Sequence, residues 1–249
     1  MLKKLNKIII MTKFLRLLKN KVKILKGFIY QNFFIGPKLE KSIINDFHKL
    51  YYGEHIVNKV WCNTFWLGNL VMKCPLDLWI YQEIIFEIKP DIIIECGTAH
   101  GGGALFLASM CDLINNGKVI TIDIEDTKGK PEHGRITYLI GSSISKEIIE
   151  KIKSLIGNDD KILVILDSDH SKQHVLNELR IYNKFVTKGS YLIVEDTNIN
   201  GHPVCSNFGP GPMEAVEEFF KENEDFIVDK TKEKLYLSFN SNGYLKKIK

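Results

Sequence analysis

Two clusters of acidic residues carry the clearest capacity for chemistry in this sequence. Asp167-Ser168-Asp169-His170 follows one apolar run, and Glu195-Asp196-Thr197 follows another. If both runs are parallel strands, their carboxyl ends meet at one edge of a sheet and the clusters converge. Carboxylates that close repel one another unless a cation neutralises them, and oxygen ligands without a His/Cys set favour Mg²⁺. The sequence therefore predicts a magnesium site with ligands among Asp167, Asp169, Glu195 and Asp196.

Three side chains are candidate catalytic residues: His170, Asp167 and Lys73. Histidine titrates near working pH, so His170 beside the acids could serve as a general base. It could equally cap a helix or orient a ligand. Lys73 is hard to explain as a core residue, because a buried lysine needs a partner. Asp169 has an alternative role too, since it precedes a predicted helix and could be its N-cap.

A glycine-rich loop follows the apolar run Ile92–Cys96 and extends from Gly97 to Gly103. Glycine lets the backbone approach a ligand closely, and the helix that follows offers free N–H groups. The spacing is not GxGxxG, so the dinucleotide fingerprint is absent. A tight strand-to-helix turn is the alternative explanation. The candidate cofactor-binding residues here are Glu95, Gly97, Thr98, Gly101 and Gly102.

Other candidate cofactor contacts follow the next predicted strands. Asp123 ends the second strand, roughly 20–25 residues after the glycine loop, where an acid commonly binds ribose hydroxyls. A solvated strand-end acid is the alternative. Ser142 and Ser143 follow the third strand, where an adenine-edge contact would lie, and Asp167 adjoins the same edge.

The elements that would position these residues alternate along the chain. Strands are predicted at Ile92–Cys96, Lys118–Ile122, Ile136–Ile140, Ile162–Leu166, Tyr191–Val194, Phe226–Val228 and Leu235–Phe239. Helices are predicted at Lys38–Tyr52, Gly102–Leu113, Ile148–Ile156, Val175–Val186 and Met213–Phe220. This alternation predicts an α/β, Rossmann-like, doubly wound and mostly parallel seven-stranded sheet. Only the short segment Lys230–Lys234 separates the last two strands, so they should be antiparallel.

Composition fits one globular domain with an N-terminal extension, predicted as residues 1–50 before a domain of residues 51–249. Of the 249 residues, 45% are hydrophobic and 26% charged, with a net charge of +4. The positive charge is concentrated in Met1–Lys26, which has no acidic residue, and the remainder is acidic. No basic face for nucleic acid is therefore indicated. The five cysteines form no CxxC pair, which indicates free thiols in the cytoplasm.

The lysine-rich segment Met1–Lys26 leaves two interpretations open. Its apolar residues include Ile8, Ile9, Ile10 and Phe14, but its lysines interrupt any stretch of the roughly 20 apolar residues that a membrane span needs. It is either a basic amphipathic helix on the inner membrane surface or a solvated extension. In both cases we expect it to be dispensable for chemistry.

Several stretches together resemble the cephalosporin hydroxylase family, which includes rhamnosyl O-methyltransferase-like proteins. The resemblance covers about Tyr51 to Lys247. The matching stretches are Trp66–Gly68, Lys73–Glu83, Leu166–Ser171, Val194–Thr197 and Gly209–Pro212.

This resemblance implies a class I methyltransferase fold that binds S-adenosylmethionine and magnesium. Gly97 and its loop would hold the methionine end of the cofactor, and Asp123 would hold the ribose. Glu195 and Asp196 would bind the metal with Asp167 or Asp169, of which Asp169 has the better family spacing. Apart from the resemblance, Trp66, Lys73 and Tyr81 precede the predicted sheet and could form a lid over the acceptor. The alternative for Trp66, Trp79 and Tyr81 is packing in the core.

We therefore expect an O-methyltransferase that acts on a sugar hydroxyl of a glycolipid or polysaccharide, or on a small secondary metabolite. One alternative is a component of a β-lactam hydroxylase, although no local 2-His-1-carboxylate iron motif is evident. Another is a non-catalytic partner protein, which would have no need of four close carboxylates. The sequence leaves the acceptor and any homo-oligomer open.

Overall fold

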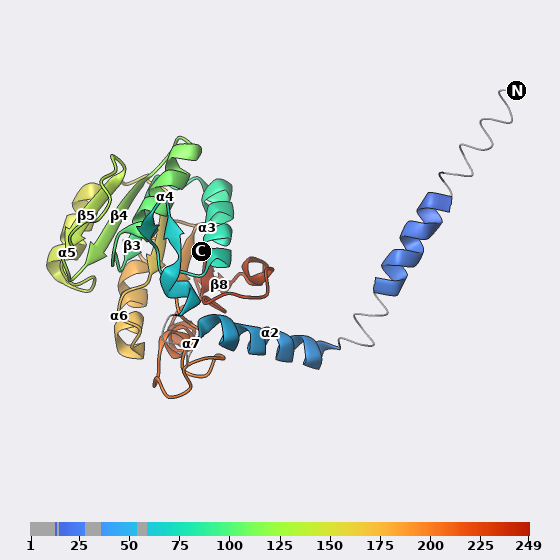
Figure 1. The fold of residues 1–249 in the computed structure, drawn as a ribbon. Coiled ribbons are helices and arrows are strands. Elements are labelled where there is room, and N and C mark those ends of the chain that lie inside the picture. Colours follow the sequence, from blue (N-terminus) through green and yellow to red (C-terminus); the bar gives the residue numbers. More distant parts are fainter. Residues whose placement is uncertain (1–12, 14, 28–35, 54–58) are drawn as a thin grey trace, which may run out of the picture. The chain divides into compact units, whose positions relative to one another are not determined.

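The computed structural model describes residues 13, 15–27, 36–53 and 59–249. The chain separates into two compact units, Met1–Phe47 and His48–Lys249. In the first unit, residues 15–27 form a helix (Figure 1). Helix α2 (Pro37–Tyr52) begins one residue before its predicted start. No helix among the described residues is long and apolar enough to span a membrane.

A seven-stranded sheet forms the centre of the second unit. Its strands are β3 (Ile92–Cys96), β4 (Lys118–Asp123), β5 (Ile136–Ile140), β6 (Ile162–Leu166), β7 (Tyr191–Val194), β8 (Phe226–Val228) and β9 (Tyr244–Lys247). Their spatial order is β5-β4-β3-β6-β7-β9-β8, and β3 to β7 are parallel. β9 is antiparallel to both neighbours. The predicted fold class is confirmed. The last two strands are antiparallel, but the second of them does not lie at the predicted residues.

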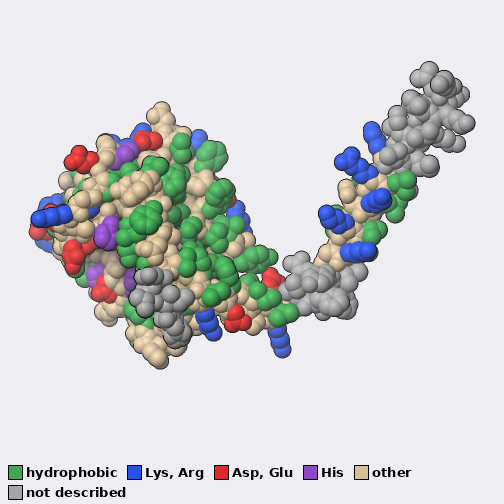
Figure 2. Space-filling view, viewed as in Figure 1, with side chains coloured by type: hydrophobic (Ala, Val, Ile, Leu, Met, Phe, Trp, Pro, Cys, Tyr) green, Lys and Arg blue, Asp and Glu red, His purple; other side chains and the backbone are tan. Residues whose placement is uncertain are grey.

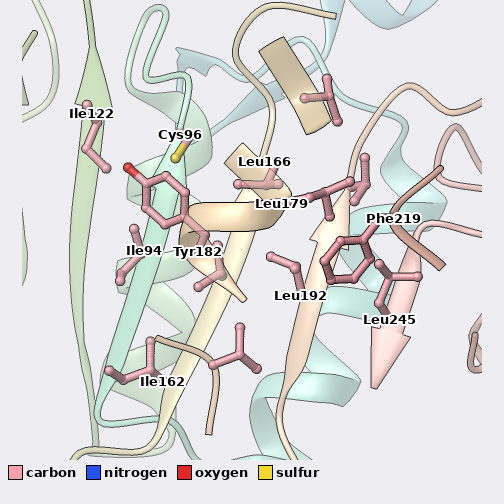
Figure 3. Close-up of a cluster of buried hydrophobic side chains, with 14 of the residues drawn as sticks. Ile94, Cys96, Ile122, Ile162, Leu166, Leu179, Tyr182, Leu192, Phe219 and Leu245 are labelled. Carbon is pink, nitrogen blue, oxygen red and sulfur yellow. The ribbon is translucent and has the colours of Figure 1, made fainter. Parts of the chain in front are cut away.

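Helices cover both faces of this sheet (Figure 1). They are α3 (Pro75–Ile88), α4 (Gly102–Leu113), α5 (Lys146–Leu155), α6 (Lys172–Tyr182) and α7 (Pro212–Glu222). Successive side chains of a strand point to opposite faces, so Ile94 packs on the α5, α6 and α7 side while Ile93 packs on the α3 and α4 side. Figure 3 shows the first of these clusters, in which Tyr182 and Phe219 fill the space above the strands. The carboxyl ends of five parallel strands therefore share one fixed edge.

The predicted strand at Leu235–Phe239 is wrong. That segment is irregular, and the last strand lies further along the chain, at Tyr244–Lys247. The linker before it contains a short 3-10 helix, η2 (Lys230–Glu233). Leu237 and Phe239 are apolar for another reason: they belong to a separate small cluster, in which the Phe239 ring stacks on His48 with centroids 5.6 Å apart.

Four described elements ahead of the sheet, a 3-10 helix, two short strands and helix α3, had no predicted counterpart. A short 3-10 helix, η1 (Val60–Asn63), leads into a hairpin of β1 (Phe65–Trp66) and β2 (Asn69–Leu70). Helix α3 follows it, with Pro75 at its start. The hairpin lies so close to the start of α4 that a Cβ at Gly102 would collide with the carbonyl of Leu70. Lys73, between hairpin and helix, is thereby held at the edge of the sheet.

Candidate active site

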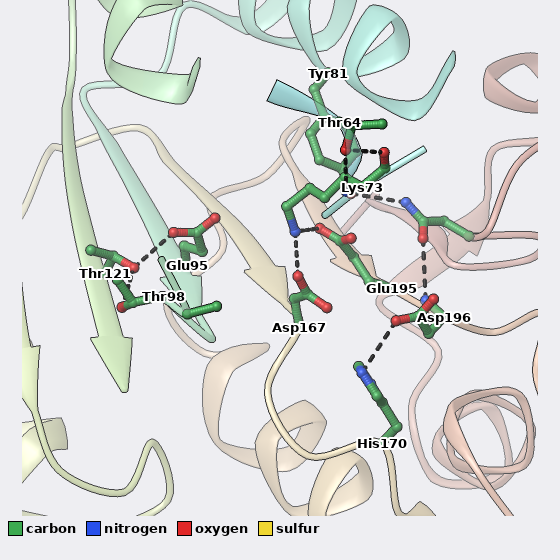
Figure 4. Close-up of polar contacts among 12 residues, drawn as sticks. Thr64, Lys73, Tyr81, Glu95, Thr98, Thr121, Asp167, His170, Glu195 and Asp196 are labelled. Atoms are coloured by element: carbon green, nitrogen blue, oxygen red, sulfur yellow. Dashed lines mark hydrogen bonds and ion pairs between the residues drawn. The ribbon is translucent and has the colours of Figure 1, made fainter. Parts of the chain in front are cut away.

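A buried ammonium group joins the two predicted acid clusters. Lys73 Nζ contacts Asp167 Oδ2 and lies 2.5 Å from Glu195 Oε1, and Lys73 is only 6% exposed (Figure 4). Burial alone would lower the pKa of Lys73, but Asp167, Glu195 and Glu95 outweigh it and raise that pKa. Lys73 therefore has the partners that its burial demands, and it stays protonated at neutral pH. A permanently protonated lysine can orient carboxylates but cannot accept a proton.

The second polar contact at this edge pairs Asp196 with His170. His170 Nε2 lies 3.2 Å from Asp196 Oδ2, and both side chains are partly exposed (Figure 4). Asp196 has a left-handed backbone, with φ of 53°. Such a conformation is strained in a non-glycine residue and persists where the surroundings impose it, often at functional sites.

A buried polar platform imposes that conformation. Asn240, fully buried, accepts a hydrogen bond from Asp196 N at 3.3 Å and donates to Tyr81 Oη at 2.8 Å. Asn240 is itself held by Ser238, which donates to Asp77 Oδ1 at 2.6 Å. The irregular segment that replaced the predicted strand thus supports the second acid cluster.

Three side chains of this edge could jointly hold a metal ion. Ligand atoms of Asp167, His170 and Asp196 all lie within 4.8 Å of one another. Burial raises the pKa of Asp196, and burial with the nearby Asp167 raises that of Glu195. One ammonium cannot neutralise all of these carboxylates, so the donor set fits a divalent cation.

The other two predicted metal ligands are engaged differently. Asp169 Oδ1 accepts a hydrogen bond from Ser171 N at 2.7 Å, an Asx turn that leads into α6. The N-cap of α6 is Ser171, so Asp169 lies two residues before the cap and is not itself the N-cap. Glu195 is only 6% exposed, and its Oε1 is occupied by Lys73.

A cleft of about 520 Å³ lies beside the acid cluster, along the ends of β3, β4, β5 and β6. Of the predicted cofactor residues, Gly97, Asp123, Ser142, Ser143 and Asp167 line it. Gly97 has φ of 100°, and a Cβ there would collide with the carbonyl oxygen of Asp167. Glycine is thus required at this position for β3 and β6 to end so close together. The volume of the cleft is within the range of small-molecule sites.

Asp123, at the end of β4, holds the backbone of the glycine loop. Its Oδ2 accepts hydrogen bonds from Thr98 N at 3.0 Å and Ala99 N at 2.9 Å. The remaining predicted loop residues are not among those that line the cleft. Glu95 is buried and accepts from Thr121 Oγ1, and Gly101 is the N-cap of α4. Gly102 begins that helix.

Sequence reasoning missed several residues of the cleft wall. Ile124 and Glu125 directly follow Asp123, and the exposed Ile124 is an apolar surface at the cleft. The fact that Ile124 and Glu125 directly follow the end of a predicted strand could have identified them as cleft residues. Ser168 and His174 also line the cleft, and His174 carried no signal because it lies inside a helix.

The aromatic residues ahead of the sheet have separate roles. Tyr81 is buried in the core. Trp66 packs edge-on against Phe106 and donates to Ser109 Oγ at 3.0 Å. Trp79 is 60% exposed and is not a core residue.

Comparison with known proteins gives one consistent result. Residues 58–248 match the family Rhamnosyl O-methyltransferase/CmcI. A rhamnosyl O-methyltransferase of Mycobacterium leprae (strain TN) is 40% identical over 210 residues, covering 82% of this chain and 90% of the relative. One from Mycobacterium tuberculosis (strain ATCC 25618 / H37Rv) is 37% identical over 231 residues, covering 90% and 91%. A solved structure of CmcI with Mg and SAM shares the fold, with a TM-score of 0.60, 18% identity and coverage of 76% and 78%.

Proposed function

The chain belongs to the rhamnosyl O-methyltransferase/CmcI family, and we propose that it transfers a methyl group from S-adenosylmethionine to a sugar hydroxyl with the help of Mg²⁺. The observation that carries this proposal is the adjacency of the cleft and the acid cluster. Asp167 belongs to both, because it lines the cleft and contacts Lys73. The cofactor site and the reaction centre thus meet at one residue.

Asp167 and Asp196 are the proposed metal ligands, because their oxygens are the hard donors within the 4.8 Å group. When bound, the cation would stabilise the negative charge that develops on the acceptor oxygen. Lys73 holds Asp167 in place and neutralises Glu195 behind it. Asp169 and Glu195 stay predictions as further ligands.

His170 is the proposed general base. Asp196 lies 3.2 Å from its Nε2 and can stabilise the imidazolium that forms. The acceptor hydroxyl gives its proton to His170 as its oxygen forms the new bond to the methyl carbon. The bond from that carbon to the sulfonium sulfur breaks, and its electron pair stays on sulfur.

A sugar acceptor is supported by the relatives, which are named for a rhamnosyl group and match most of this chain. The proposal also keeps residues 51–249 as the methyltransferase domain and residues 1–50 as an extension. The assay is transfer of labelled methyl to a simple rhamnoside, with and without a chelator. Methylation that needs Mg²⁺ supports the proposal, and full activity in excess chelator would remove the metal from it.

The N-terminal helix supports a further proposal, contact with an anionic membrane surface. Figure 2 shows basic side chains along one side of residues 15–27 and apolar ones along another. Leu17 and Ile24, seven residues apart and so on one face, are 61% and 71% exposed. The apolar residues Ile8, Ile9, Ile10 and Phe14 lie outside the described residues.

Each basic residue near such a surface contributes on the order of 1 kcal/mol. Vesicle flotation of the full chain and of a variant lacking residues 1–26 tests the contact. Equal recovery of both proteins in the soluble fraction, with anionic lipid at low salt, would leave the solvated extension. Loss of cofactor binding on truncation would show that the boundary is wrong.

A further inference from the structure

A buried carboxylate lies under the wall of the cleft. Glu178 of α6 is completely buried, and its Oε1 accepts hydrogen bonds from Ser143 Oγ at 2.5 Å and Ser168 Oγ at 2.7 Å. His174 Nε2 lies 3.3 Å from the same oxygen and 3.2 Å from Ser143 Oγ. Glu178 therefore joins the ends of β5 and β6 to the first turns of α6.

All three side chains that converge on Glu178 line the cleft. Burying a carboxylate is costly unless donors surround it. Here Oε1 gathers all of these donors, while Oε2 is buried without a hydrogen-bond partner among the described residues. The carboxylate thus fixes the orientation of cleft-lining groups, and an apolar residue at this position could not do so.

His174 is oriented by these contacts. Its Nε2 is engaged by Ser143 and Glu178, and the hydrogen bond to Glu178 raises the pKa of His174. Its Nδ1 makes no hydrogen bond with the part of the chain that the structure describes. The side chain is 21% exposed, so one edge of the ring is available to a ligand.

The position of His174 in the cleft indicates which part of a ligand it would contact. Asp123, at the end of β4, is the proposed ribose partner, and Ser143, after β5, contacts His174. If the ribose of a nucleoside lies at Asp123, then Ser143 and His174 are the polar groups around its base on the β5 side of the cleft. We propose that His174 recognises the adenine edge of the cofactor through Nδ1, and that Glu178 is its positioning residue.

This inference rests on the proposed function, and nucleoside analogues test it. S-adenosylhomocysteine and S-inosylhomocysteine differ along one edge of the base, where the amine at position 6 is replaced by a carbonyl and N1 gains a proton. We expect the wild-type protein to bind the adenosyl form at least about tenfold more tightly in calorimetry, as one lost hydrogen bond and one unpaired group imply. His174→Leu should weaken the adenosyl complex about tenfold and bring the two affinities within roughly threefold.

Glu178→Gln keeps the side-chain volume but loses the charge that gathers the donors. It should lower the same affinity ratio and change the ¹⁵N chemical shifts of His174, which report its tautomer. Gln173→Ala is the matched control, because Gln173 lies on the same helix and, within the described part of the chain, its side chain bonds only to Asn177 at an exposed position. This control should keep the wild-type ratio.

The outcomes separate the two proposals. Absence of S-adenosylhomocysteine binding by the folded wild-type protein would overturn the proposed function, and this inference with it. Normal binding with an unchanged ratio in His174→Leu would overturn the adenine contact alone. If Glu178→Gln does not fold, the ratio in His174→Leu still decides the adenine contact.

Discussion

Replacing Lys73 by methionine should cost the protein much of its stability. Methionine fills nearly the same volume but leaves Asp167 and Glu195 without their buried cation. Breaking a buried pair by removing one partner typically costs about 3–5 kcal/mol, because an uncompensated charge stays behind. A chain of this kind has a total stability of only about 5–15 kcal/mol. The free energy of unfolding should therefore fall by about 3–5 kcal/mol without metal.

Lys234 offers a matched control. Its Nζ lies 2.5 Å from Glu83 Oε2, the same distance as Lys73 from Glu195, but the Lys234 side chain is 50% exposed. An exposed ion pair contributes only about 0–1 kcal/mol. Lys234→Met should therefore shift the unfolding midpoint little. Because the two ion pairs have the same length, the difference in unfolding free energy between the two variants reports the effect of burial.

Urea unfolding in chelator, and again with excess Mg²⁺, measures both effects. Magnesium should restore more stability to Lys73→Met than it adds to the wild-type protein, because the cation replaces the missing positive charge. Equal unfolding free energies of Lys73→Met and Lys234→Met in chelator would refute the role of Lys73 as counterion. An identical response to Mg²⁺ in both variants would refute a metal site beside Lys73.

Three further results are expected. Asp77→Asn should lower the free energy of unfolding in urea by about 1–3 kcal/mol. One oxygen of Asp77 accepts from the Tyr244 hydroxyl and the other from the Phe239 N–H, so an amide that keeps the first bond turns its NH₂ toward the second donor. An unchanged unfolding midpoint would contradict this. Asp123→Ala should weaken S-adenosylhomocysteine binding by about 1–3 kcal/mol in calorimetry, and wild-type affinity would exclude Asp123 from the site. Burial lowers the pKa of His48 from 6.5 to about 4. The stability of the folded protein that depends on a neutral His48 is therefore complete above pH 6.5 and is lost as pH falls toward 4, by up to about 3 kcal/mol. His48→Phe should remove this pH dependence, and parallel pH profiles of stability in the two proteins would contradict it.

The sheet could be predicted because its strands are buried on both faces. Ile162–Leu166 is a continuous apolar run, and Ile92–Cys96 is interrupted only by Glu95; each is followed by chemistry-bearing residues, and both have the predicted bounds. Helix α4 also has its predicted bounds, because glycine and the apolar spacing mark its start. Strand ends therefore predicted which residues share the edge where the cleft and the acid cluster lie.

Residues outside those strand ends could not be predicted in the same way. Leu235–Phe239 has the composition of a strand, but its apolar side chains pack under α2 residues that are far away in sequence. Glu178 is a charged residue on an amphipathic helix, and nothing in its neighbours distinguishes it from a solvated one. Lys73 was known to need a partner, yet only the fold brings Glu195, 122 residues later, to it.

That sequence separation has a consequence for how the protein is made. Lys73 leaves the ribosome 94 residues before Asp167 and 122 before Glu195. At roughly 5–20 residues per second, the lysine waits about 6–24 s for its second partner. Asp77 waits longer, because Tyr244 is 167 residues further along. The apolar helix that carries Asp77 thus keeps a charge that it cannot bury until Tyr244 has been synthesised, and the reaction centre cannot close before Glu195 has been made.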